Sequence, residues 1–96
     1  MELFDKLKEK REDILRIASR HGAYNVRVFG SVARGDADSG SDIDFLVDME
    51  PDRSLFDLGG LLMDLKVLLK QKVDVVTERS LHWYIRDRII KESKYL

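Results

Sequence analysis

The stretch FGSVARGDADSGSDIDFLVD, residues 29–48, decides how the rest of the chain is interpreted. Residues 36–41 within it are small and polar turn formers with nothing to bury, so we expect a loop there. After this loop, apolar side chains alternate with mostly acidic ones until Pro51, a period of two that is typical of a β-strand. The stretch therefore predicts a loop that leads into a half-buried strand.

The chain before this loop predicts a helix and a second strand. Residues 2–20 carry apolar side chains at spacings of three and four among charged ones, which predicts an amphipathic helix. His21-Gly22 should end that helix, because glycine adopts the left-handed conformation of a helix end. The β-branched run from Asn25 to Phe29 then predicts a short strand. Residues 31–35 can form a brief helical turn.

A second long helix follows the acidic strand. Ser54 to Asp57 resembles a capping box, and leucines at helical spacing continue up to Lys70. Gly59-Gly60 inside this helix should cost about 1 kcal/mol each relative to alanine. Either a neighbour packs close to that turn, or the helix begins later; the sequence leaves both open.

The remaining residues complete an alternation of helices and strands. Val73 to Thr77 predicts a third strand, and we expect Ser80 to cap a last helix. The apolar stripe of that helix is Leu81, Ile85 and Ile89. The order is α-β-α-β-α-β-α, which favours one α/β domain spanning residues 1–96.

Composition excludes several classes of protein. With 44% hydrophobic and 36% charged residues, the chain has the composition of an ordinary globular domain. The 17 basic and 18 acidic residues give a net charge of −1, so we expect neither direct nucleic-acid binding nor attraction to an acidic membrane. The absence of cysteine excludes disulfides and thiolate metal sites. No apolar run suits a signal peptide or membrane span, so we expect a cytoplasmic protein.

Three aspartates form a candidate metal site. Asp42 and Asp44 lie two residues apart in the predicted strand, so their carboxylates share a face about 6–7 Å apart. Two such charges repel by roughly 2 kcal/mol at an effective dielectric constant of about 20, and Asp74 on a neighbouring strand adds to this. A cation would offset the repulsion, and hard oxygen ligands favour Mg²⁺ or Mn²⁺. Phosphoryl transfer is the chemistry that such a site serves.

Gly30-Ser31 is a candidate phosphate cradle. Backbone N–H groups at a glycine that ends a strand can approach a phosphate closely, and the Ser31 hydroxyl can donate a further hydrogen bond. Arg34 can pair with phosphate oxygens through its guanidinium group. Taken alone, each piece also fits an ordinary turn or a solvated acidic surface. Together, with ten residues between Ser31 and Asp42, they indicate one site.

These motifs resemble a known family. Residues 29–35 (FGSVARG) and 41–47 (SDIDFLV) look like the signature of the DNA polymerase beta-type nucleotidyltransferase superfamily, and of its minimal nucleotidyltransferase branch. Residues 73–77 (VDVVT) match the strand that carries the third carboxylate, and residues 80–89 look like the terminal helix of that branch. Gln71-Lys72 departs from relatives that often have a glycine there. The resemblance implies the nucleotidyltransferase fold, a small mixed sheet of three or four strands flanked by helices.

The resemblance also implies roles for the site residues. Asp42, Asp44 and Asp74 would be catalytic and would hold two Mg²⁺ ions, with Mn²⁺ as an alternative, and ATP would be the substrate. Asp74 would also help to remove the acceptor proton. Gly30, Ser31 and Arg34 would bind the nucleotide.

Minimal nucleotidyltransferases of this kind act as antitoxins that adenylylate a tyrosine of a HEPN-domain ribonuclease, so the resemblance implies such a partner. Only 22 residues follow Asp74, which leaves no room for an acceptor-binding domain, so we expect the acceptor to bring its own surface. Two alternatives stay open: a non-catalytic antitoxin that only forms a complex, and a transferase that acts on a small hydroxylated molecule.

A few other side chains have less specific interpretations. We expect His21 to be a helix-end cation. We expect an aromatic group near the start of the last helix to pack the end of that helix or to contact a partner protein. A basic group on the same helix is either a solvated face or a surface that attracts the triphosphate. The aromatic group is His82, Trp83 and Tyr84, and the basic group is Arg86, Arg88, Lys91 and Lys94.

Overall fold

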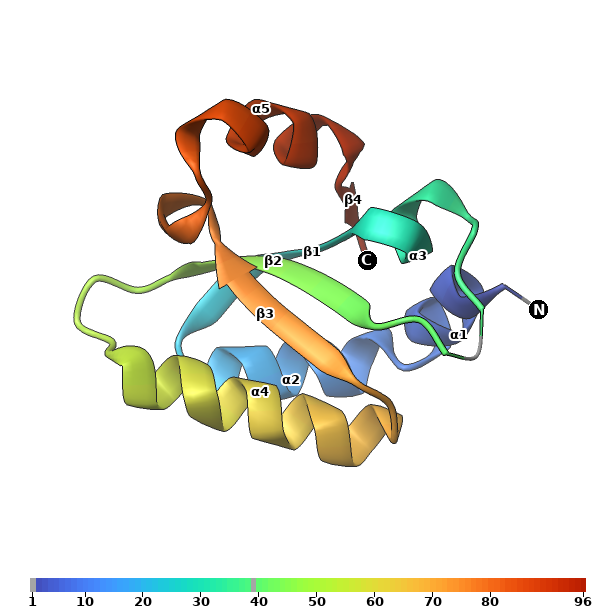
Figure 1. Cartoon of the computed structure of the whole chain (residues 1–96). Coiled ribbons are helices and arrows are strands. Elements are labelled where there is room, and N and C mark those ends of the chain that lie inside the picture. Colours follow the sequence, from blue (N-terminus) through green and yellow to red (C-terminus); the bar gives the residue numbers. More distant parts are fainter. Residues whose placement is uncertain (1, 39) are drawn as a thin grey trace.

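A computed structural model describes residues 2–38 and 40–96 of the chain (Figure 1). The helices are α1 (Leu3–Glu9), α2 (Arg11–Arg20), α3 (Gly30–Arg34), α4 (Leu55–Leu69) and α5 (Trp83–Glu92), with a 3₁₀ turn η1 (Glu78–Ser80). The strands are β1 (Ala23–Phe29), β2 (Ile43–Met49), β3 (Val73–Thr77) and β4 (Lys94–Tyr95). Ser39, in the predicted loop, lies outside the described residues. Within the described ranges, none of the helices has the length and apolar character needed to span a membrane.

The four strands form one mixed sheet in the order β3-β2-β1-β4. β1 runs antiparallel to both β2 and β4, whereas β2 and β3 are parallel and are joined by the crossover helix α4. This small mixed sheet with helices on both sides confirms the predicted fold class. The predicted bounds of the third strand, Val73 to Thr77, are also confirmed.

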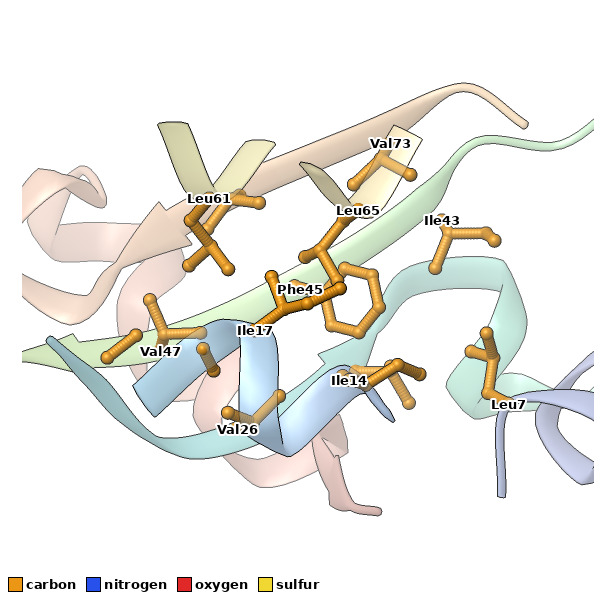
Figure 2. Close-up of a cluster of buried hydrophobic side chains, with 14 of the residues drawn as sticks. Leu7, Ile14, Ile17, Val26, Ile43, Phe45, Val47, Leu61, Leu65 and Val73 are labelled. Atoms are coloured by element: carbon orange, nitrogen blue, oxygen red, sulfur yellow. The ribbon is translucent and has the colours of Figure 1, made fainter. Parts of the chain in front are cut away.

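The main core lies between the sheet and helices α1, α2 and α4 (Figure 2). Phe45 at its centre is fully buried. Ile43 and Val47, two positions away on β2, point to the same side of the sheet, as the predicted alternation requires. The other side chains of the main core come from the helices and strands around Phe45, each of which turns one face toward it. Figure 2 labels Leu7, Ile14, Ile17, Val26, Ile43, Val47, Leu61, Leu65 and Val73 in this cluster.

The opposite face of the sheet carries the polar residues. Arg27, Leu46 and Asp48 lie on this side, because Arg27 pairs with Leu46 across β1 and β2 and residues two apart share a face. Helix α5 lies over this face, away from α2 and α4 (Figure 1). Leu46 is fully buried although it is not part of the main core. The sheet is therefore covered on both sides.

The predicted helix over residues 2–20 is wrong in one respect, since it is two helices. Lys10 leaves helical geometry, with φ −98° and ψ 13°, and it separates α1 from α2. The buried positions Leu7 and Ile14 lie on the two sides of this break. Both short helices therefore contribute to the main core, Leu7 from α1 and Ile14 from α2.

The structure decides between the two possibilities for Gly59-Gly60. Helix α4 begins at Leu55 as predicted, with the Ser54 N–H donating to Asp57 (2.9 Å) and the Ser54 hydroxyl accepting from the Phe56 N–H (3.2 Å). Gly60 lies against the ring of His21, whereas a β-carbon at Gly59 would meet nothing within 4 Å. A neighbour therefore does pack close to the helix, but only at Gly60.

His21 ends α2 and also contacts a second helix. Its Nε2 atom lies 2.7 Å from an Asp64 carboxylate oxygen on α4. This contact joins α2 to α4 where the His21 ring lies against Gly60. The pair thereby ties together the two helices that cover the core.

The C-terminal part differs from the prediction in two ways. Ser80 does not cap the last helix, because it exchanges hydrogen bonds with Thr77 around the 3₁₀ turn, and α5 starts at Trp83. The two-residue strand β4 after α5 has no pattern long enough to be seen in the sequence. It exists because β1 offers a free edge for pairing.

Candidate active site

Asp44 and Asp74 are brought together by the parallel pairing of β2 and β3. They are direct Cα partners in the ladder, so both side chains leave the sheet on the same face. Ile43 between the two acidic residues of β2 is 1% exposed and points into the main core, as predicted. Asp42 immediately precedes β2, and both it and Asp74 are exposed, whereas Asp44 is half-buried. The three predicted carboxylates thus gather at the start of two neighbouring strands.

The electrostatics of this group are unfavourable in the ligand-free chain. Burial raises the pKa of Asp44 above its ordinary value, and the negative charges of Asp74 and Asp42 raise it further. The positive charge of Arg34 acts in the opposite direction. The site therefore concentrates more negative charge than its arginine neutralises.

The donor chemistry of this group suits a hard divalent cation. All three side chains offer carboxylate oxygens, the ligands that Mg²⁺ and Mn²⁺ prefer, and the neighbouring charges that raise the pKa of Asp44 would be offset by a cation. Across residues 2–38 and 40–96, however, no three Asp, Glu, His or Cys side chains are arranged closely enough to hold one ion. The residues fit a metal by chemistry, and Asp42 and Asp74 have the exposure that allows their side chains to move.

Gly30 places the predicted phosphate cradle beside these carboxylates. β1 ends in extended backbone at Phe29, and Gly30 then turns the chain into α3 with φ +70°, in the left-handed region. A β-carbon at Gly30 would lie 2.5 Å from the Oδ2 atom of Asp44. The glycine is therefore required both by the turn and by the close carboxylate. Ser31 follows at the start of α3 and is half-buried.

A cleft of about 420 Å³ opens at this point between the end of β1, α3 and α5. The residues that line it are Phe29, Gly30, Arg34, Arg88, Ile89 and Glu92. Arg34, predicted to bind nucleotide, lies in this cleft and pairs with Asp36 (3.3 Å) and Glu92 (3.4 Å). Asp36 is the main cause that raises the pKa of Arg34.

Two charged residues of the cleft are not assigned to the site by the sequence. Arg88 belongs to the basic helix face whose role the sequence leaves open, and the structure places it on the cleft. Glu92 carries no signal, because only the packing of α5 over the sheet brings it to Gly30, 62 positions away. Arg88 directly precedes Ile89, which is buried, and this adjacency could have suggested that Arg88 lies near the sheet.

A larger hollow of about 600 Å³ lies elsewhere, at the carboxyl ends of β2 and β3. Asp48 and Glu78 line it, and Asp48 is about 13 Å along the strand from Asp44. None of the predicted site residues lines this hollow. Gly30 and Arg34 line the smaller cleft, whereas the three aspartates do not, so the candidate active site is this cleft together with the carboxylates beside Gly30.

The aromatic residues at the start of α5 contact one another. The His82 and Tyr84 ring centroids are 4.3 Å apart, and the Trp83 ring is 5.8 Å from that of Tyr84. Trp83 and Tyr84 are 79% and 67% exposed, so these rings do not fill the core. The cluster is an exposed aromatic surface.

A small mixed sheet that presents paired aspartates beside a strand-ending glycine defines a nucleotidyltransferase. The description "Nucleotidyltransferase domain" belongs to a family model that matches residues 5–96. The chain belongs to this family, and it is a nucleotidyltransferase of the minimal branch.

Individual relatives agree with this assignment. "Putative protein adenylyltransferase MJ0435" of Methanocaldococcus jannaschii is 38% identical over 87 residues, which covers 91% of this chain and 94% of that protein. Protein adenylyltransferase MntA of Thermococcus cleftensis is 38% identical over 80 residues, covering 83% and 81% respectively.

Solved structures share the fold. One described as "Structure of putative minimal nucleotidyltransferase" superimposes with a TM-score of 0.88 at 44% identity and covers 100% of this chain and 97% of its own. A chain from a toxin–antitoxin crystal structure with AMP-PNP superimposes with a TM-score of 0.74 at 22% identity, over 88% of this chain and 69% of its own. The second likeness concerns the fold alone.

Proposed function

We propose that this protein transfers AMP from ATP to a tyrosine hydroxyl of a HEPN-domain toxin and thereby acts as its antitoxin. The observation that carries the proposal is the position of Gly30 against Asp44, which in turn is the ladder partner of Asp74. Protein adenylyltransferase is the name of the Thermococcus cleftensis relative, and one chain of a toxin–antitoxin structure shares this fold. A protein acceptor is thus the substrate class that relatives favour.

In this proposal the triphosphate binds at the cleft between α3 and α5. The Gly30 N–H donates to a phosphate oxygen, and the Ser31 hydroxyl donates a second hydrogen bond. Arg34 on the cleft wall pairs with another phosphate oxygen through its guanidinium group. These donors orient the nucleotide so that its α-phosphate faces the carboxylates.

Asp42, Asp44 and Asp74 are the residues that would hold divalent cations. When bound, Mg²⁺ would neutralise phosphate charge and favour departure of pyrophosphate. The half-buried Asp44 is nearest to the cradle, so it links the nucleotide-binding and carboxylate parts of the site.

The transfer forms a bond between the acceptor oxygen and the α-phosphorus. The bond from that phosphorus to the bridging oxygen breaks, and pyrophosphate leaves with the electron pair. Asp74 accepts the acceptor proton, because it is exposed at the edge where a docked protein would present its hydroxyl. Residues 1–96 act as one domain in this scheme, in the cytoplasm, where ATP and Mg²⁺ are available.

The deciding experiment uses the purified chain, a HEPN-domain partner from a neighbouring gene, ATP and Mg²⁺, with intact mass spectrometry of both proteins. The expected result is a partner heavier by one AMP group, and fragmentation of its peptides should locate that group on a tyrosine. Asp44→Asn together with Asp74→Asn should abolish the gain while the protein stays folded.

Other outcomes identify the alternatives. An unmodified partner held in a stable complex would favour an antitoxin that works by binding alone. A partner that is neither modified nor bound would favour a small-molecule acceptor.

A further inference from the structure

Glu92 occupies the cradle that the proposed function assigns to the triphosphate. Its Oε1 atom accepts a hydrogen bond from the Gly30 N–H at 2.8 Å. The same oxygen lies 3.4 Å from Nη1 of Arg34. One carboxylate oxygen of the chain therefore engages both the backbone donor and the guanidinium group that face the cleft.

The C-terminal segment fixes Glu92 in this place. Glu92 is the last residue of α5, and β4 begins two residues later and pairs with β1, with Lys94 opposite Val28. The carbonyl oxygen of Leu96 accepts a hydrogen bond from the Nε atom of Arg11 on α2 at 2.8 Å. The main chain that follows Glu92 is thus anchored to the rest of the fold.

A carboxylate is a reasonable substitute for a phosphate oxygen at this position. Both offer negatively charged acceptors, and charge-assisted hydrogen bonds to N–H and guanidinium groups are the stronger kind. Glu92 is half-buried on the cleft wall, and its charge is among those that raise the pKa of Asp44. The carboxylate is therefore close to the aspartates as well as to the cradle.

We propose that Glu92 is a built-in competitor of the triphosphate: it satisfies the Gly30 N–H and Arg34 in the empty site and must be displaced when nucleotide binds. The inference rests on the nucleotide-binding half of the proposed function. The side chain of Glu92 can rotate away while α5 and β4 stay in place, because the competing contacts are made by its terminal carboxylate alone. The effect is to lower the affinity for ATP.

The test is the dissociation constant for ATP with Mg²⁺, measured by isothermal titration calorimetry on the full chain. Glu92→Gln keeps the size of the side chain and removes its charge, so ATP should bind about 1.5- to 5-fold more tightly, the range expected for releasing exposed ionic contacts. Asp87→Asn on the exposed side of α5 changes the net charge equally and should leave the affinity unchanged. Melting temperatures of all variants verify that they fold.

Inorganic tripolyphosphate is a second probe, and its affinity should rise in parallel, because the competition concerns phosphate oxygens and not the base. Unchanged or weaker ATP binding by folded Glu92→Gln would overturn the proposal, and weaker binding would make Glu92 a ligand-binding residue. An equal gain in Asp87→Asn would also overturn it, since the effect would then be one of overall charge.

The same measurements distinguish failure of this inference from failure of the proposed function. Tighter ATP binding by Glu92→Gln without any AMP transfer to a partner would support the competitor and contradict the transferase. Folded proteins that bind neither ATP nor tripolyphosphate would overturn both.

Discussion

A β-carbon added to Gly30 would lie 2.5 Å from the Oδ2 atom of Asp44, closer than two such atoms can approach. The turn that ends β1 and the carboxylate at the start of β2 are therefore in direct contact across the antiparallel pair, in which Phe29 is opposite Asp44. No side chain can be inserted between the cradle and the carboxylate. This contact makes the two motifs one site.

Gly30→Ala should reduce AMP transfer by about 100-fold, because the new methyl group would push the Asp44 carboxylate out of its position, and a displacement of about 1 Å has an effect of that size. The left-handed backbone should also cost about 1–2 kcal/mol of stability. Gly35→Ala is the matched control, with φ +81° but only Glu2 nearby at 3.8 Å. It should lose similar stability and keep its activity; equal activity of the two variants would contradict the argument.

Asp44→Asn should abolish transfer and raise the melting temperature at neutral pH without metal. The folded pKa of Asp44 is above its unfolded value, so the folded chain holds this proton more tightly and stability falls as pH rises between the two values. Removing the charge relieves this penalty. We therefore expect Asp44→Asn to melt at a higher temperature than the wild type at pH 7.

The comparison for that variant is Asp52→Asn, at an exposed turn position, whose Tm should not change. The Tm advantage of Asp44→Asn should disappear at pH 3, where the wild-type carboxyl is protonated in both states. Mg²⁺ should raise the Tm of the wild type more than that of the variant. A variant that melts below the wild type at pH 7 would contradict the pKa argument.

Arg27 holds a buried ion network, and its replacement by alanine should cost about 3 kcal/mol. The side chain is 5% exposed and pairs with Glu78 at 3.1 Å and Asp48 at 3.3 Å. Its Nε atom also donates to the carbonyl oxygen of Asn25 at 2.8 Å. Arg27→Ala leaves two half-buried carboxylates without their cation, which is the costly change.

Urea denaturation measures this loss as a lower midpoint. Arg16→Ala provides the reference, since the Arg16–Asp13 pair is also close, at 3.0 Å, but is exposed on α2. Its loss should change stability by less than about 1 kcal/mol. Similar losses in both variants would show that the Arg27 network contributes no more than a surface pair.

Gly59→Ala should stabilise the protein by about 0.5–1 kcal/mol, because the position is helical and nothing lies within 4 Å of the added methyl group. Gly60→Ala should not, since its β-carbon would lie 2.8 Å from Cε1 of His21 and would disturb the contact with Asp64. Thermal melts of the two single variants measure the change in stability that each substitution causes. A gain at Gly60 as large as that at Gly59 would mean that His21 moves away at no cost.

Much of the site could be predicted from the sequence because its parts are local. The period-two pattern around Asp42 and Asp44 determines which side chains face the core, and burial of Ile43 and Phe45 agrees with it. The glycine at position 30 was recognisable because a β-branched run that stops at Gly-Ser marks a turn of the main chain. The bounds of β3 and the capping box at Ser54 followed from equally local rules.

Other features depend on which elements meet, and no local rule gives that. The break at Lys10 separates α1 from α2, although the apolar spacing of residues 2–20 continues across it. The ion network of Arg27 and the contact of His21 with Gly60 join residues that lie far apart in sequence.

The sequence alone determined which groups the candidate site contains: the carboxylates, the glycine turn and the alternating strand that presents them, since each depends on neighbouring residues. Only the tertiary structure decided that Asp44 and Asp74 are ladder partners, that Gly30 contacts Asp44, and that Glu92 fills the cradle. The physical reason is that strand pairing and the packing of α5 bring together groups that are separated by 14 to 62 positions, and the energy of these contacts belongs to the folded chain and not to any segment of it.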